Sequence, residues 1–179
     1  MTTTYEVRLA DLQEQRAAVV CGRITRDQIA DFLGGAFGEV MDLLASQDMQ
    51  PAGPPFARYR FRDDGILEVD AGFPVPAPVT PAGRVEASTL PGGRVATTMH
   101  VGDYAGVGSA YDAASQFLTE EGYEVADAPW ECYLDDPDVP APRTEVFMPC
   151  RPVRAAADRV ASVDQADQAD QVDQVDYPN

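Results

Sequence analysis

The sequence contains no lysine and a single histidine, His100. Its 13 basic residues are therefore all arginines, against 30 acidic residues, and the net charge at pH 7 is −17. Residues 1–150 alone hold 24 acidic and 10 basic residues, a net charge of −14. A chain this acidic is repelled by phosphate backbones, and no arginine cluster with interleaved aromatics is present. We expect no direct binding of nucleic acid, and a neutral or cationic small molecule suits the charge better.

Cysteine is also scarce, with Cys21, Cys132 and Cys150 widely spaced in apolar, strand-like sequence. There is no CxxC pair, and none of the three has metal-ligand spacing to His100. Free cysteine usually behaves as a small buried hydrophobe. We therefore expect plain buried thiols, no metal site and no cofactor.

Long hydrophobic runs are missing as well. The longest apolar stretches span a handful of residues, whereas a membrane-spanning helix needs about 20. The N-terminal sequence "MTTTYEVRLADLQEQ" has no basic region followed by an apolar stretch, so it does not resemble a secretory signal. These absences predict a cytoplasmic protein that does not associate with membranes.

The composition changes near residue 153. From residue 163 onward the chain repeats Asp-Gln-Ala or Asp-Gln-Val, with no aromatic residue before Tyr177. Such a segment cannot bury enough apolar surface to fold. We predict one domain over 1–153 and an acidic, low-complexity, disordered tail over 154–179.

Within 1–153 the sequence reads as two similar halves, each with the order strand, helix, strand, strand. The first half holds "QRAAVVCGRI", an apolar helical pattern from Ile29 to Leu44, "PPFARYRF" and "ILEVDAGFPV". The second holds "GGRVATTMHVGDY", a helical pattern from Val107 to Leu118, "APWECYL" and "TEVFMPC". "PPFARY" and "APWECY" share the pattern Pro-aromatic-x-x-Tyr, and "LEV" matches "TEV".

This duplication predicts an α+β fold in which an antiparallel sheet carries two main helices. A further strand in "RVEASTLPGG" is expected to open the second half. Where two pseudo-symmetric halves meet, a central ligand cleft is expected, because junctions of this kind are common sites for small molecules.

Two glutamates, Glu131 and Glu145, lie inside strand-like runs. A buried carboxylate costs several kcal/mol unless it is paired, so each needs a partner, solvent or a ligand. With the two-residue period of a strand, Glu145 shares a face with Phe147. A carboxylate beside an aromatic ring suits a cation. The alternative is that Glu145 points to solvent or pairs with an arginine such as Arg143.

The segment "WECYL" gives a second candidate set. Trp130 and Cys132 share one strand face, and Glu131 and Tyr133 share the other. An acid next to a phenol suits binding or acid–base chemistry. The alternative is an apolar Trp130 face and a solvated Glu131 face. Phe56 and Tyr59, the first-half counterparts of Trp130 and Tyr133, are expected either to reach the same cleft or to pack in the core.

The ordered set "QRAAVVCG", "GPPFARY", "LPGGRVATTMHVGDYAGVGSAYDAASQFLTEEGYE", "WECYLDDP" and "TEVFMPC" resembles the GyrI-like small-molecule-binding family, also known as the AraC-type bacterial effector-binding domain. The resemblance implies an aromatic-rich cleft between the two halves. It also implies that Glu145 lies in that pocket and attracts lipophilic cations, with Tyr133 reaching the ligand and Trp130 forming a wall. Because the resemblance begins near Tyr5, no DNA-binding part is expected ahead of it.

Three functions follow from these observations. The first is a stand-alone protein that captures lipophilic, in particular cationic, small molecules for sequestration or sensing; its ligand-binding residues would be Glu145, Tyr133, Trp130, Phe147, Phe56 and Tyr59. The second, implied by the resemblance, is a hydrolase of cyclopropane-bearing DNA-alkylating natural products; its catalytic residues would be Glu145 or Glu131 with Tyr133. The third is an acidic interaction module that inhibits a basic partner such as a topoisomerase.

Overall fold

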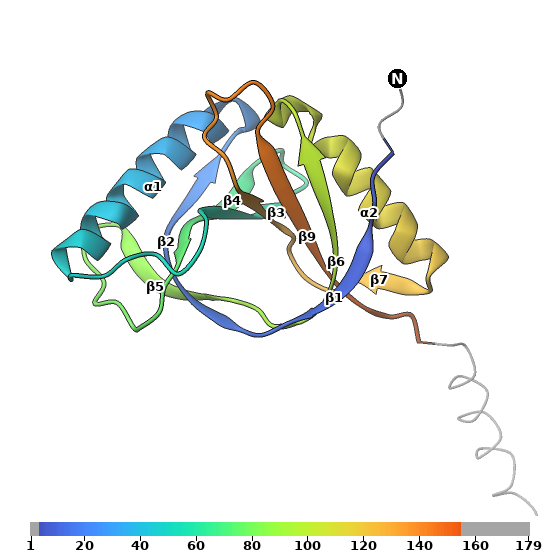
Figure 1. Ribbon diagram of the computed structural model, residues 1–179, viewed down its shortest axis with the longest axis horizontal. Helices are drawn as coiled ribbons and strands as arrows, with labels where there is room; N and C mark the ends of the chain where they lie inside the picture. Colours follow the sequence, from blue (N-terminus) through green and yellow to red (C-terminus); the bar gives the residue numbers. More distant parts are fainter. Residues whose placement is uncertain (1–3, 155–179) are drawn as a thin grey trace, which may run out of the picture.

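The computed structural model describes residues 4–154, which form a nine-stranded antiparallel sheet with two main helices on one face (Figure 1). The helices are α1 (Ile29–Ser46) and α2 (Gly108–Glu120), each preceded by a short 3-10 helix, η1 (Arg26–Gln28) or η2 (Tyr104–Gly106). The strands are β1 (Arg8–Leu12), β2 (Gln15–Ile24), β3 (Phe56–Phe61), β4 (Leu67–Pro74), β5 (Val85–Leu90), β6 (Gly93–Val101), β7 (Tyr123–Val125), β8 (Trp130–Tyr133) and β9 (Arg143–Pro152).

The order of the strands shows the duplication directly. The sheet runs β1-β6-β9-β8-β3-β4-β2-β5, with β7 paired to β9. Read from the other end, the same order relates β3 to β8, β4 to β9, β2 to β6 and β5 to β1. The pseudo-twofold axis therefore passes between β3 and β8, in the middle of the sheet. The predicted α+β fold with two strand-helix-strand-strand units is confirmed.

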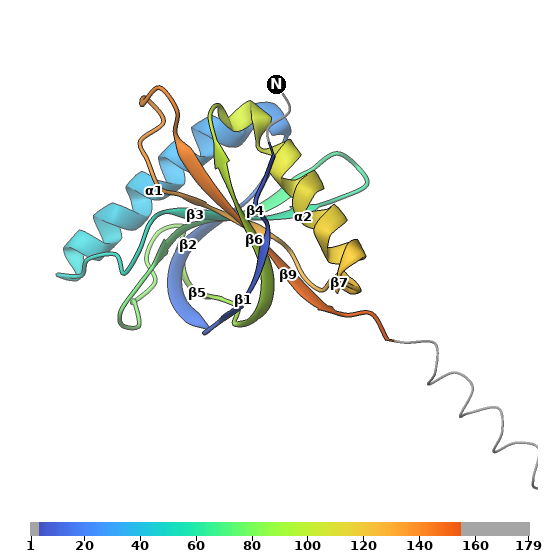
Figure 2. The ribbon, with the colours of Figure 1, turned by 45° about the vertical axis from the view of Figure 1, so that its right-hand side comes forward.

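The strand predicted in "RVEASTLPGG" exists, as β5, but its partner lies in the other half. It pairs with β2 of the first half, and β1 likewise pairs with β6 of the second half. Figures 1 and 2 show β1, β2, β5 and β6 curving away from the helices, around the opposite face of the sheet. The exchanged outer strands therefore tie the two halves together.

The strand registers fix which residues of the two halves are equivalent. Matching Phe56 to Trp130 also superimposes Pro74 on Pro149, and Thr25 and Asp103 precede η1 and η2 in the same way. The equivalent pairs used below are Phe56 with Trp130, Tyr59 with Tyr133, Arg60 with Leu134, Asp70 with Glu145, Gly72 with Phe147, and Glu86 with Arg8. The sequence overlay of "LEV" on "TEV" had paired Glu68 with Glu145; the registers shift that match by two residues, to Asp70.

The core is divided by the sheet. On the helix face, α1 buries Ala36, Val40 and Leu44 against β2, β3 and β4, while α2 buries Ala114 and Leu118 against β6 and β9. On the opposite face, called the strand face below, a smaller apolar cluster is enclosed by the curved strands. Alternation along each strand produces both faces, because successive side chains point to opposite sides. Each fully buried leucine or valine contributes about 1.5–3 kcal/mol to folding.

Within residues 4–154 no helix is long and apolar enough to cross a membrane. The predicted tail from residue 154 onward lies almost entirely outside the described residues.

Candidate functional site

The sheet separates the sequence-predicted site residues into two groups. Glu131, Tyr133 and Tyr59 lie on the helix face, in line with the residues that pack against α1 and α2. The strand face holds the other four, Phe56, Trp130, Glu145 and Phe147. The side chains of Glu145 and Tyr133 thus point to opposite sides of the sheet. The structure therefore contains two candidate sites.

On the helix face, Glu131 is the centre of a buried hydrogen-bonded cluster. The Tyr111 hydroxyl, from α2, donates to Glu131 Oε1 at 2.9 Å. The Tyr133 hydroxyl donates to Glu131 Oε2 at 2.8 Å, and the Tyr59 and Tyr133 hydroxyl oxygens are 2.8 Å apart. Because the proton of Tyr133 is used on Glu131, Tyr59 donates to Tyr133. Tyr104 stacks edge-on against Tyr133, with ring centroids 5.6 Å apart.

Burial shifts the proton affinities in this cluster. Glu131 is 8% exposed, and desolvation raises its pKa, although the Tyr133 and Tyr111 hydrogen bonds act in the opposite direction. Burial, followed by the nearby Glu131 charge, raises the pKa values of Tyr133, Tyr111 and Tyr59. The phenols therefore stay protonated and act as donors. Both oxygens of Glu131 already accept a hydrogen bond from the protein, so the cluster satisfies itself.

Two further polar groups share this face. His100 Nε2 lies 2.9 Å from the Asp103 carbonyl oxygen and therefore carries a proton, which leaves Nδ1 to accept from the Tyr5 hydroxyl at 2.9 Å. Thr144 lies between Tyr133 and His100 in the strand register. Its hydroxyl is buried without a hydrogen-bond partner among the described residues. His100 thus serves to fix the end of β6 against η2 and the N-terminal segment.

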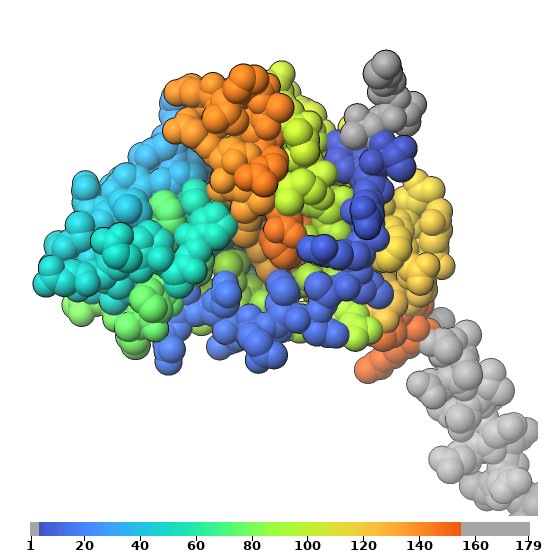
Figure 3. Space-filling view, viewed as in Figure 1, coloured from blue at the N-terminus to red at the C-terminus, as the bar shows by residue number. Residues whose placement is uncertain are grey.

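On the strand face, aromatic rings form an apolar cluster across the pseudo-twofold axis. Trp130 and Phe147 stack with ring centroids 5.3 Å apart and planes 10° from parallel. Phe56, the equivalent of Trp130, lies on the neighbouring strand, and both are 2% exposed. Phe147 and Cys132 are half-buried and pack against this cluster, so they form its accessible side. Atoms of β9 are visible in the middle of the space-filling view, bordered by β1 and by the connection from β8 to β9 (Figure 3).

Glu145 lies at the margin of these rings. It faces Cys132 across the β8–β9 pair, and its side chain is 21% exposed. Thr97 Oγ1 donates to Glu145 Oε1 at 3.1 Å, and the Arg8 guanidinium lies 3.6 Å from the same oxygen. Burial, with Glu145 and Glu131 nearby, raises the pKa of the Cys132 thiol to about 12. The thiol therefore stays neutral, and the carboxylate is the anionic group beside the aromatic pair.

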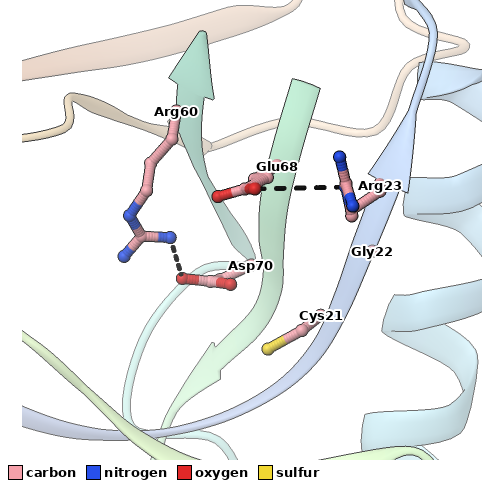
Figure 4. A pocket seen from close by; sticks show the side chains of 6 residues that line it. All are labelled: Cys21, Gly22, Arg23, Arg60, Glu68 and Asp70. Carbon is pink, nitrogen blue, oxygen red and sulfur yellow. Dashed lines mark hydrogen bonds and ion pairs between the residues drawn. The ribbon is translucent and has the colours of Figure 1, made fainter. Parts of the chain in front are cut away.

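A pocket of about 330 Å³ lies on the strand face of the first half, among residues that the sequence did not single out. Its lining is Cys21, Gly22, Arg23, Arg60, Glu68 and Asp70 (Figure 4). Arg60 pairs with Asp70 at 2.8 Å, and Arg23 lies 4.0 Å from Glu68. Cys21 is exposed, so the prediction of a buried thiol is wrong for this cysteine; partial desolvation, then Asp70, raises its pKa to about 12. The pocket is thus lined by charged side chains that pair with one another and by a thiol that stays protonated at neutral pH.

Sequence reasoning missed Tyr111, Arg8 and Thr97. Tyr111 appeared only as a member of an apolar helical pattern, and nothing in the spacing indicated that its hydroxyl meets Glu131. Arg8 and Thr97 reach Glu145 because β1 pairs with β6 and β6 pairs with β9. Among residues 4–154 no group of three or more His, Cys, Asp or Glu side chains is placed to hold a metal ion.

The sequence matches the GyrI-like small molecule binding domain over residues 5–151. The chain therefore belongs to the GyrI-like family and is a small-molecule-binding domain. No curated protein matches the sequence.

Solved structures share the fold at low sequence identity. The EcmrR C-terminal domain is 17% identical, with a TM-score of 0.69, 84% of this chain covered and all of that one. The EcmrR chain in the EcmrR–DNA complex is 17% identical, with a TM-score of 0.73. The match covers 83% of this chain and 58% of the EcmrR chain. A hydrolase from Listeria innocua is 16% identical, with a TM-score of 0.59, and the match covers 82% of this chain and 92% of the hydrolase. SAV2435 bound to tetraphenylphosphonium is 14% identical, with a TM-score of 0.57, and the match covers 82% of this chain and 94% of SAV2435.

Proposed function

We propose that the strand face binds lipophilic cations, with Glu145 as counter-ion and the stacked Trp130 and Phe147 rings as the aromatic wall. The observation that carries this proposal is the position of Glu145, a half-buried carboxylate at the margin of an aromatic pair. A cation there gains both the attraction of the carboxylate and that of the ring faces, the latter about 0.5–2 kcal/mol. Phe56, from the first half, packs in the same apolar cluster.

The helix face is the weaker candidate for this role. Glu131 is more deeply buried than Glu145, and Tyr111 and Tyr133 occupy both of its oxygens. A ligand there would have to break these hydrogen bonds and replace them. Hydrolysis also needs a carboxylate and a phenol converging on one water site, whereas Glu131 and Tyr133 converge on each other. We therefore propose binding for sensing or sequestration, with the ligand left chemically unchanged.

Tetraphenylphosphonium, which SAV2435 binds, is a suitable probe. We expect the wild type to bind it and Glu145→Gln to lose affinity about tenfold, equivalent to about 1.4 kcal/mol. Isothermal titration calorimetry measures the constants, and Trp130, the only tryptophan, reports binding through its fluorescence. Chromatography of the recovered probe would detect any turnover.

The chain offers a matched control for that experiment. Asp70 is the first-half equivalent of Glu145 and has a similarly covered side chain, 19% exposed. Asp70→Asn removes the same charge from the protein, and we expect it to leave tetraphenylphosphonium binding within twofold of the wild type. The tetraphenylborate anion, of the same shape, should bind more weakly than the cation. Equal binding to the wild type and Glu145→Gln would refute the proposal.

A further inference from the structure

The two halves treat their equivalent carboxylates differently. In the first half, Asp70 pairs with Arg60 of the adjacent strand β3 at 2.8 Å. The position equivalent to Arg60 in the second half is Leu134, which has no charge. Glu145 instead faces Arg8, from the outer strand β1, at 3.6 Å. In the first half, the position of Arg8 is taken by Glu86.

The contact between Arg8 and Glu145 has the features of an exchangeable ion pair. At 3.6 Å the two atoms are too far apart for a hydrogen bond, and the Arg8 side chain is 72% exposed. Exposed ion pairs of this kind contribute little to stability. The Arg60–Asp70 pair is a short, charge-assisted hydrogen bond with a less exposed arginine, 41%. A ligand cation that displaces Arg8 from Glu145 therefore breaks a weaker contact than a cation that displaces Arg60 from Asp70.

We propose that Arg8 is a built-in competitor for the ligand: its guanidinium occupies the cation position beside Glu145 and is displaced when a lipophilic cation binds. Arg8 thereby sets the affinity and the charge selectivity of the site. This inference rests on the proposed function of the strand face. It also accounts for the asymmetry of the halves, because Arg60 is held to Asp70 by a short hydrogen bond, whereas Arg8 lies loosely against Glu145 and can be displaced.

The proposal makes a prediction of unusual sign, namely that removing a residue next to the site strengthens binding. Without Arg8, no arginine has to leave Glu145 when the ligand binds, and the like charge next to that carboxylate is gone. We expect Arg8→Gln to bind tetraphenylphosphonium about two- to fivefold more tightly than the wild type, the range that an exposed ion pair supports. Tetraphenylborate should bind more weakly to this variant than to the wild type.

Two comparisons make the test specific to the contact with Glu145. Arg23→Gln removes an exposed arginine that is also loosely paired, 4.0 Å from Glu68, on the same sheet face in the other half. We expect it to leave both affinities unchanged. In a double-mutant cycle measured by calorimetry, Arg8→Gln should have no effect on tetraphenylphosphonium binding in the Glu145→Gln background.

Each outcome supports or overturns the role of Arg8, and the proposed function can be judged separately from it. The role of Arg8 is supported if Arg8→Gln binds the cation more tightly and Arg23→Gln does not. The gain in affinity from Arg8→Gln must also disappear in the Glu145→Gln background. Unchanged or weaker cation binding in Arg8→Gln, with binding by the wild type intact, overturns that role and leaves the proposed function standing. If neither the wild type nor Arg8→Gln binds the probe, both are overturned.

Discussion

Replacing Glu131 by alanine is expected to lower the free energy of unfolding by about 3–5 kcal/mol. The substitution leaves the buried Tyr111 and Tyr133 hydroxyls without their acceptor and opens a cavity at the centre of the sheet. Each unsatisfied buried hydroxyl costs about 1–3 kcal/mol. Urea denaturation followed by Trp130 fluorescence measures the loss. The effect is a large part of the 5–15 kcal/mol that stabilises a typical domain.

Glu131→Gln is the companion variant, because its amide fills the same space and keeps one acceptor oxygen. We expect it to cost about 1 kcal/mol, so that Glu131→Gln unfolds at a higher urea concentration than Glu131→Ala. If Glu131→Ala were as stable as Glu131→Gln, the hydrogen bonds from Tyr111 and Tyr133 would contribute nothing to the fold. That result would contradict the role assigned to this cluster.

The raised pKa of Glu131 also gives the stability a pH dependence with a defined sign. Between the ordinary carboxyl value of 4.5 and the raised folded value, the folded protein holds a proton that the unfolded chain has released. The free energy of unfolding contributed by this group is therefore greatest below the ordinary value and falls as pH rises through the folded pKa. The tyrosines around it stay neutral. We expect the stability difference between wild type and Glu131→Gln to fall with pH from about pH 4 upward.

Trp130→Ala is expected to abolish ligand binding and to lower the free energy of unfolding by about 3–5 kcal/mol. Trp130 is 2% exposed and stacks on Phe147, so its removal takes away both a core side chain and half of the proposed aromatic wall. Affinity for tetraphenylphosphonium should fall by at least about tenfold, because ring-face attraction and apolar contact are both lost. Calorimetry and circular dichroism measure the two effects without relying on tryptophan emission.

Trp130→Phe separates the two contributions. Phenylalanine is the residue that the first half carries at this position, Phe56, so the fold accepts it there. We expect a smaller loss of stability than in Trp130→Ala and an affinity within about fivefold of the wild type, since an aromatic face remains. If Trp130→Ala stayed folded and bound the probe with unchanged affinity, the aromatic wall would lie elsewhere.

Local alternation allowed the faces of β8 and β9 to be predicted from sequence. The two-residue period placed Glu131 with Tyr133, Trp130 with Cys132, and Glu145 with Phe147, and the structure has all three pairs. Internal similarity was sufficient for the α+β architecture as well. These features depend on neighbouring residues in the chain, which is why they could be derived without long-range information.

The relation between strands could not be derived in the same way. Nothing local indicates that β1 joins β6 and β5 joins β2, and this exchange is what brings Arg8 to Glu145. The sequence analysis also gathered Glu145, Tyr133 and Trp130 around one ligand, because a face cannot be assigned to the helix side or the strand side from alternation alone. The placement of the ligand-binding residues remains a proposal, now divided into a strand-face set and a helix-face cluster.

The location of the bound cation tests the central claim most directly. A crystal structure of the protein soaked with or grown in tetraphenylphosphonium would show it. We expect the phosphonium on the strand face, against Trp130 and Phe147, with Glu145 as the nearest carboxylate and Arg8 turned away. A phosphonium on the helix face, among Tyr59, Tyr111 and Tyr133, would contradict it.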